Sequence, residues 1–223
     1  MTSLQTKPLR VWDVPTRLFH WALVVLVVTS VASVKAGNMD LHLNSGYAVL
    51  SLVLFRILWG FFGTTYARFG SFVRGPGQVV EYAKSMLRPP HAFHAGHNPM
   101  GGWMVVVMLA VLLFQASTGL FANDDVITEG PLAKRVSKAV SDTLSTLHRR
   151  NEWVIYGMVV LHVLAVVGYL VRFRENLVRP MLTGTKQAPA DASFAGITGS
   201  RIGVAAALLA VCATGVWFVA KRL

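Results

Sequence analysis

Residues 148–171 read HRRNEWVIYGMVVLHVLAVVGYLV, a long apolar run with one histidine at its start and a second within it. About 20 apolar residues are enough for a helix to cross the hydrocarbon core of a membrane. His148 and His162 are fourteen residues apart. In a helix they would lie within about 40° of each other and about 21 Å apart along the axis. The segment therefore predicts one transmembrane helix that presents two histidines on one face, at two depths.

Four further apolar segments predict additional transmembrane helices. The five segments cover approximately Leu18–Val34, Gly46–Gly63, Gly101–Ala122, Trp153–Val171 and Ile202–Ala220. They must be helical, because lipid cannot hydrogen-bond an open backbone. The composition agrees, with 54% hydrophobic and only 14% charged residues and a mean hydropathy of +0.53. A soluble domain carries about 25% charged residues. The sequence predicts an all-α integral membrane protein and argues against a soluble enzyme.

The charges and the single cysteine narrow the class further. The net charge of +11 comes from Lys and Arg in short segments between the apolar runs. That pattern sets membrane topology, so we expect no nucleic-acid partner. When the loops are assigned to alternate sides of the membrane, twelve Lys and Arg residues fall on the side of the N-terminus and eight on the opposite side. This predicts a multi-pass membrane protein with a cytoplasmic N-terminus and a C-terminus on the outer side. Cys212 alone cannot form an internal disulfide or a cysteine cluster, and without a C-x-x-C-H motif any haem must be noncovalent.

Two more histidines lie at depths that match those of the first pair. His20 is at the cytoplasmic start of the first span, and His42 just precedes the second span on the outer side. Matching depths pair His42 with His148 near the outer face and His20 with His162 towards the cytoplasm. Two such pairs in a four-helix bundle suit two six-coordinate b haems. The alternative for any single interfacial histidine is an amphipathic side chain among lipid headgroups.

The sequence around these histidines resembles the bacterial dihaem cytochrome b561 family, within the superfamily of nickel–iron hydrogenase b-type cytochromes and formate dehydrogenase membrane subunits. The matching stretches are VWDVPTRLFHW at 11–21, GHNPMGG at 96–102 and QASTGLFANDD at 115–125. The resemblance covers roughly residues 8–185, and it implies a location in the bacterial inner membrane, with the C-terminus in the periplasm. It implies that the first two spans give one haem ligand each and the fourth gives two. These ligands are His20, His42, His148 and His162.

The resemblance and the composition together divide the chain into three parts. Residues 1–185 are expected to form a four-helix, haem-binding membrane bundle. Residues 186–200 lie in a stretch rich in Gly, Ala, Ser, Thr and Pro and are predicted to be a linker. Residues 201–223 are predicted to be an additional C-terminal transmembrane helix, which contacts lipid or a partner.

Two arginines are candidates for holding haem propionates. Arg56 follows His42 by fourteen residues and therefore shares its helix face, towards the cytoplasmic side. A charge-assisted bond to a propionate of the inner haem is one role, and snorkelling towards the headgroups is the alternative. Arg17, one turn before His20, is the second candidate.

His97 and Asn98, at the start of the third span, are the candidates for hydrogen-bonding a quinone. Residues 12–13 (Trp-Asp) lie on the same side and either contribute to that site or anchor the topology. His91, His94 and His97 have an H-x-x-H-x-x-H spacing. A zinc site would need a fourth ligand or a bound water and a defined scaffold, so we expect a cytoplasmic loop instead.

These observations predict a dihaem b-type membrane cytochrome with two noncovalent, bis-histidine haems. It would carry electrons between the quinone pool and a periplasmic redox protein such as a c-type cytochrome. Asp124 and Asp125, at the outer end of the third span, suit a basic partner, whereas basic residues nearby suit an acidic partner or superoxide. Two alternatives stay open. One is a self-sufficient enzyme such as a superoxide:quinone oxidoreductase, and the other is a haem-binding membrane anchor subunit.

Overall fold

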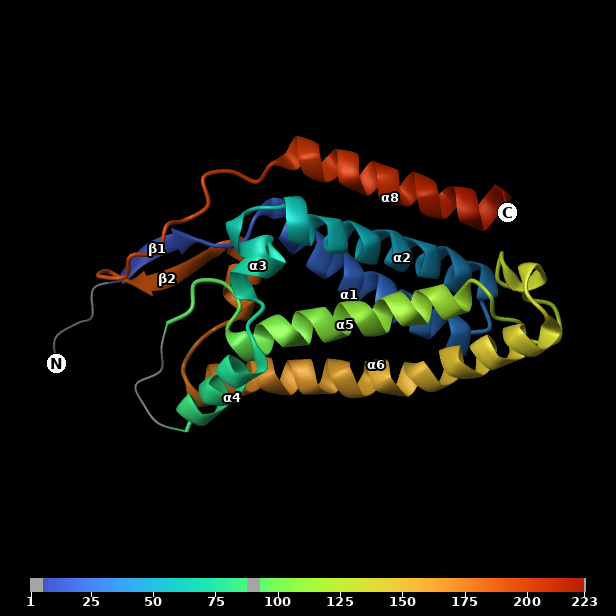
Figure 1. Ribbon diagram of the computed structural model, residues 1–223, viewed down its shortest axis with the longest axis horizontal. Coiled ribbons are helices and arrows are strands. Elements are labelled where there is room, and N and C mark those ends of the chain that lie inside the picture. The colour runs from blue at the N-terminus through green and yellow to red at the C-terminus, as the bar shows by residue number, and fades with distance from the viewer. Residues whose placement is uncertain (1–5, 88–92, 223) are drawn as a thin grey trace.

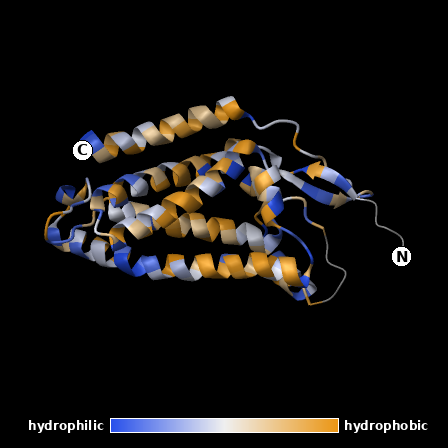
Figure 2. Cartoon of the chain, turned by 180° about the vertical axis from the view of Figure 1, so that it is seen from behind, coloured by the Kyte–Doolittle hydropathy of each residue, from blue (hydrophilic) through white to orange (hydrophobic). Residues whose placement is uncertain are grey.

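The computed structural model describes residues 6–87 and 93–222, which are mostly helical (Figure 1). Five long helices carry the fold: α1 (Val14–Lys35), α2 (Met39–Phe62), α5 (Pro99–Gly119), α6 (Lys138–Arg172) and α8 (Ile202–Arg222). Each is long and apolar enough to cross a membrane. Hydrophobic residues dominate these helices, and many hydrophilic ones gather near the ends of the molecule (Figure 2). The predicted all-α membrane fold, with a fifth C-terminal helix, is confirmed.

The helices form a bundle with α8 along its outside (Figure 1). The closely packed pairs are α1 with α2, α2 with α5, α5 with α6, and α2 with α8. The largest core cluster is built on α2, where Val53, Phe55 and Trp59 are buried against side chains of α1, α5 and α8. We call the end of the bundle that holds His20 and His162 the inner end, and the end that holds His42 and His148 the outer end.

Side-chain caps define where two helices begin at the inner end. The carboxylate of Asp13 accepts a hydrogen bond from the Thr16 backbone N–H at 2.6 Å, and α1 starts directly after it. The side chain of Asn98 accepts one from the Gly101 N–H at 2.8 Å, and α5 starts with Pro99. Caps of this kind satisfy N–H groups that have no partner within the helix. Both helices therefore enter the bundle from fixed positions beside the inner histidines.

Helix α6 is longer than its apolar run indicates. The apolar span was predicted to begin near Trp153, but α6 begins at Lys138, shortly after a 3-10 helix (Ala133–Arg135). Ser141 and Ser145, in the polar first turns of α6, are buried against the preceding loop. The Ser141 hydroxyl donates to the Phe121 carbonyl at 2.7 Å. The Ser145 hydroxyl accepts from the Asn123 N–H at 2.8 Å. His148 therefore lies well inside a continuous helix rather than at its start.

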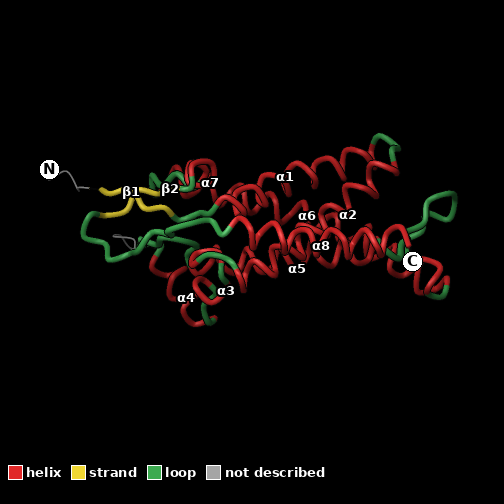
Figure 3. The backbone as a smooth tube through the Cα atoms, turned by 90° about the horizontal axis from the view of Figure 1, so that it is seen from above, coloured by secondary structure: helices red, strands yellow, loops and turns green. Residues whose placement is uncertain are grey.

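A small sheet covers the inner end of the bundle, opposite the loop that precedes α6 (Figure 3). Strand β1 (Thr6–Arg10) pairs antiparallel with β2 (Thr185–Pro189), so that Thr6 lies opposite Pro189. Part of the predicted linker is therefore a strand. A second core cluster of Leu9, Val11, Trp12, Ala95 and Ala188 fixes the sheet to the bundle. We refer to this sheet and cluster as the inner cap.

Short helices complete the inner end. They are the 3-10 helix Thr65–Ala67, α3 (Phe69–Phe72), α4 (Pro76–Ser85) and α7 (Val178–Thr183). The residues after β2 are also held in place, since the Ile197 N–H donates to the Arg10 carbonyl at 2.9 Å. The Tyr66 hydroxyl donates to the Ala195 carbonyl at 2.8 Å. These contacts attach the chain leading into α8 to the inner cap.

Candidate functional site

The four histidines predicted as ligands form two facing pairs. His42, in the first turn of α2, faces His148 of α6 with ring centroids 6.2 Å apart. His20 of α1 faces His162 of α6 with centroids 6.4 Å apart. Two imidazoles that bind one metal ion from opposite sides, at about 2 Å each, place their centroids about 6 Å apart. Both pairs therefore have the separation that two axial ligands need.

Backbone carbonyls orient the outer pair. The Nδ1 atom of His42 lies 2.9 Å from the carbonyl oxygen of Ser30. Nδ1 of His148 lies 2.9 Å from the carbonyl oxygen of Gln115. A carbonyl only accepts hydrogen bonds, so Nδ1 carries the proton in both rings and Nε2 keeps its lone pair. Partners of this kind hold a metal-binding imidazole in its tautomer and orientation. Neither Ser30 nor Gln115 was predicted, because the contacts are made by backbone atoms.

A cavity of about 320 Å³ adjoins the outer histidines. Most of its lining is apolar and comes from α1, α2, α5 and α6, with Ile155 of α6 in the position predicted between the two α6 histidines. Gly46 lines the cavity, and a Cβ added there would meet nothing within 4 Å. At Gly119 an added Cβ would lie 2.9 Å from Cε1 of His148. Glycine at 119 therefore gives the His148 ring its room.

The side chain of Gln115 also touches His148. Its amide nitrogen lies 3.2 Å from Nε2 of His148, while its amide oxygen accepts from Asn151 at 2.9 Å. A metal bound at Nε2 requires that amide to turn aside. Asn151 also donates to the Val111 carbonyl at 3.2 Å, which keeps it in place when Gln115 moves.

A comparison with known proteins identifies the family. A family model described as prokaryotic cytochrome b561 matches residues 11–184. The chain belongs to this family. The match contains both histidine pairs and the first four long helices. This cytochrome is therefore a multi-pass bacterial membrane protein of a haem b family, and it takes part in electron transfer.

Several curated relatives have the same printed name, "Probable Ni/Fe-hydrogenase B-type cytochrome subunit". The protein from Cupriavidus necator is 26% identical over 209 residues, which cover 78% of this chain and 85% of the relative. The protein from Rhodobacter capsulatus is 24% identical, with coverage of 78% and 79%. The one from Azotobacter chroococcum is 24% identical, with coverage of 78% and 86%. No solved structure matches the chain significantly.

Buried polar atoms at the inner end test whether the residues present fit a haem. Arg56 is only 2% exposed, and its Nη1 has no hydrogen-bond partner within the described chain. The buried Nε of Arg17 and Nδ1 of His20 are likewise unpartnered there. Buried polar groups are rarely left unsatisfied in folded proteins. Two cationic donors beside a facing histidine pair fit a haem b, whose carboxylates they would bind.

Asp13 is the buried acid of the inner end. Its carboxylate accepts from the Trp59 indole N–H at 3.3 Å, from the Thr64 hydroxyl and from the cap contact with Thr16. Asp13 and Arg56 are close enough to interact electrostatically, although they form no direct ion pair. Asp13 therefore fixes α1 to the inner end of α2 and partly offsets the buried charge of Arg56.

His97 is partly buried at the inner end, and its Nδ1 atom is buried. Its ring lies between those of Trp12 and Phe72, each with its centroid 4.7 Å away. Burial, assisted by the positive charges of Arg56 and Lys186, lowers the pKa of His97 to about 3. His97 is therefore neutral at physiological pH, and its Nδ1 has no partner among the described residues.

Asn98 differs from His97 because its side chain is engaged within the protein. Beyond capping α5, its amide nitrogen donates to the Tyr169 hydroxyl at 2.7 Å, and that hydroxyl lies 2.8 Å from the hydroxyl of Tyr82. These contacts tie α4, α5 and α6 together. His91, the first member of the H-x-x-H-x-x-H group, lies outside the described residues.

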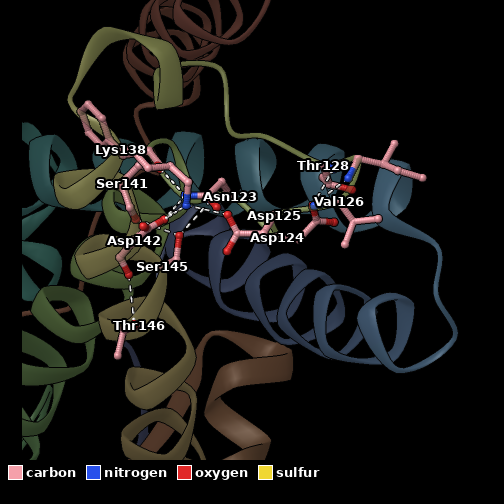
Figure 4. Close-up of polar contacts among 12 residues, drawn as sticks. Asn123, Asp124, Asp125, Val126, Thr128, Lys138, Ser141, Asp142, Ser145 and Thr146 are labelled. Carbon is pink, nitrogen blue, oxygen red and sulfur yellow. Dashed lines mark hydrogen bonds and ion pairs between the residues drawn. The ribbon is translucent and has the colours of Figure 1, made fainter.

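The acidic residues at the outer end build a rigid loop (Figure 4). One carboxylate oxygen of Asp124 accepts from the N–H groups of Val126, Ile127 and Thr128, each at 2.9 Å. These hydrogen bonds lower the pKa of Asp124 to about 2. The Lys138 ammonium contacts Asp125. The acids predicted to steer a basic partner are thus also structural, and the loop they hold exposes Val126 and Ile127 by 81% and 89%.

Proposed function

We propose that this cytochrome holds two b haems, one between His42 and His148 and the other between His20 and His162. It would use them to carry electrons between the quinone pool and a redox protein at the outer face. The main support is that the histidines form two facing pairs, whose ring centroids are 6.2 and 6.4 Å apart, and that each pair has one member on helix α6. Haem b supplies reversible one-electron chemistry, which amino-acid side chains in an apolar bundle lack.

The chain's own residues would divide the remaining work. An imidazole from each side would hold each haem, which favours electron transfer over ligand binding. Ser30 and Gln115 would hold the outer imidazoles through their Nδ1 protons. Arg56 and Arg17 would bind the propionates of the inner haem, since both carry unpartnered buried nitrogens.

We place the quinone at the inner end, beside His97. Support comes from the partly buried ring of His97, whose buried Nδ1 has no partner among the described residues and is available to bond a carbonyl or hydroxyl oxygen. Asn98 would act mainly by holding the start of α5, because its amide is bonded to Tyr169. The bias of basic residues supports a cytoplasmic inner end and a periplasmic outer end. The family match ends at residue 184, which supports a four-helix core with α8 as an addition.

The outer partner is proposed from the relatives. Their name makes a nickel–iron hydrogenase the first redox protein to test, ahead of a c-type cytochrome. Reduction of the purified cytochrome by such a hydrogenase with hydrogen would support the assignment. Rapid quinone-linked oxidation of superoxide without any partner would instead support the self-sufficient enzyme.

The deciding experiment is a haem count on the detergent-purified protein, with a pyridine haemochrome spectrum to identify the haem type. We expect two b haems per chain. His162→Ala should lose the inner haem and keep most of the outer one, while His94→Ala, a histidine outside both pairs, should keep both. One haem in the unaltered chain, or two in His162→Ala, would contradict the proposed pairs.

A further inference from the structure

The two ends of the bundle differ in buried charge. At the inner end, Arg56 is almost completely buried, and the buried Nε of Arg17 lies at the same end. Asp13 is the buried acid there, and three hydrogen-bond donors surround its carboxylate. Lys186 adds little net charge, because it is paired with Glu175 at 2.5 Å. Arg56 and Asp13 are oppositely charged and both buried, and the half-buried Arg17 leaves the inner end with a net positive charge.

The charged lining of the outer cavity has the opposite balance. It consists of Asp124, Arg149 and Glu152. Glu152 lies one helical turn beyond His148, is partly buried, and accepts a hydrogen bond from the Tyr156 hydroxyl. Arg149 is exposed, so solvent screens its charge more strongly than that of a buried group. Asp124 is exposed as well, so solvent screens its charge like that of Arg149, and the partly buried Glu152 leaves this end with a net negative charge.

We propose that Arg56 and Glu152 hold the two haems at different reduction potentials, with the inner haem the easier to reduce. This inference rests on the proposed function. A nearby positive charge favours the reduced metal, which carries one positive charge fewer, and a negative charge favours the oxidised metal. A unit charge about 10 Å from a metal centre, at an effective dielectric constant near 20, shifts its reduction equilibrium by roughly tenfold or more.

The consequence is a preferred direction of transfer. One electron passes from the outer haem to the inner one, so the outer haem is oxidised as the inner haem is reduced. No proton is required at either centre. Electrons delivered by a reduced redox protein at the outer face would therefore move downhill to the inner end, where an oxidised quinone would accept them.

A spectroelectrochemical titration of the intact cytochrome tests the order. We expect two one-electron waves whose equilibrium constants differ at least tenfold, which corresponds to midpoint potentials at least 59 mV apart. His162→Ala should retain only the lower wave, and His148→Ala only the higher one. Equal potentials, or the reverse assignment, would overturn the inference while leaving a dihaem protein intact. A chain that binds fewer than two haems would refute the proposed function itself.

Charge variants identify the residues responsible. Arg56→Gln should lower the reduction equilibrium constant of the inner haem by about tenfold and leave that of the outer haem unchanged. Arg56→Lys, which keeps the charge, should stay close to the unaltered protein. Glu152→Gln should raise the reduction equilibrium constant of the outer haem by severalfold. The change is smaller because Glu152 is partly exposed. If Arg56→Gln loses its inner haem, the Glu152→Gln variant alone tests whether these charges set the potentials. Tyr156→Phe, which removes only the hydrogen bond, is the matched control. An outer wave that does not move in Glu152→Gln would refute the role of that residue.

Discussion

Replacing Gly119 with alanine should weaken the outer haem site and spare the inner one. The new Cβ would lie 2.9 Å from Cε1 and 3.2 Å from Nδ1 of His148, whereas carbon atoms in contact prefer about 3.5–4.0 Å. The ring would have to retreat by roughly half an ångström, away from the Gln115 carbonyl that accepts its Nδ1 proton at 2.9 Å. Overpacking of this kind costs about 1–3 kcal/mol. Because 1.4 kcal/mol corresponds to tenfold, outer haem affinity should fall by about ten- to a hundredfold.

Haem transfer to excess apomyoglobin, followed by absorbance, measures this loss. Gly157→Ala is the matched control, since it adds the same methyl group on α6 where nothing lies within 4 Å. Gly119→Ala should release one haem per chain early and the other at the rate of the control. Equal release from Gly119→Ala and Gly157→Ala would refute the packing argument. Selective loss of the inner haem would refute the assignment of His148 to the outer site.

Three further variants test the inner end. The folded chain keeps His97 neutral, because its pKa is about 3 in the fold against 6.5 in the unfolded chain. The free energy of unfolding should therefore fall as the pH drops from 6.5 towards 3, by up to about 1.4 kcal/mol per pH unit. His97→Gln should flatten that dependence in unfolding titrations with SDS, and an unchanged profile would contradict it. Asp13→Asn should lose about 2–3 kcal/mol in the same assay, because a charged acceptor of the Trp59 indole is removed. A loss below 1 kcal/mol would refute its structural role. Tyr169→Phe should cost about 1–2 kcal/mol by leaving the Asn98 amide unpaired, and the haem count should not change. Loss of the inner haem there would show that Tyr169 does more than join helices.

The sequence predicted the long helices and the histidine pairs for a simple physical reason. A membrane requires continuous apolar runs, and the helical repeat then fixes how His148 and His162 face. The pairing with His42 and His20 followed from depth alone, and the ring separations agree with it. These features depend on local periodicity, which a single sequence contains.

Other features depend on contacts between distant parts of the chain. The pairing of β1 with β2 joins residues almost 180 positions apart, and a stretch rich in small residues gives no periodic signal for it. The start of α6 was predicted too late because its first turns are polar and are buried against the preceding loop. The carbonyls of Ser30 and Gln115 leave no trace in residue type, because every residue has one.

The pairing of β1 with β2 also constrains how the protein assembles during synthesis. Strand β1 leaves the ribosome before any of the long helices, but its partner β2 emerges only after α6 has been made. The inner cap therefore cannot close until four transmembrane helices have been synthesised. Until then, a haem at the site proposed between His20 and His162 would have a more open route into the bundle than the finished fold leaves. Haem insertion at the proposed inner site would thereby depend on the order of translation.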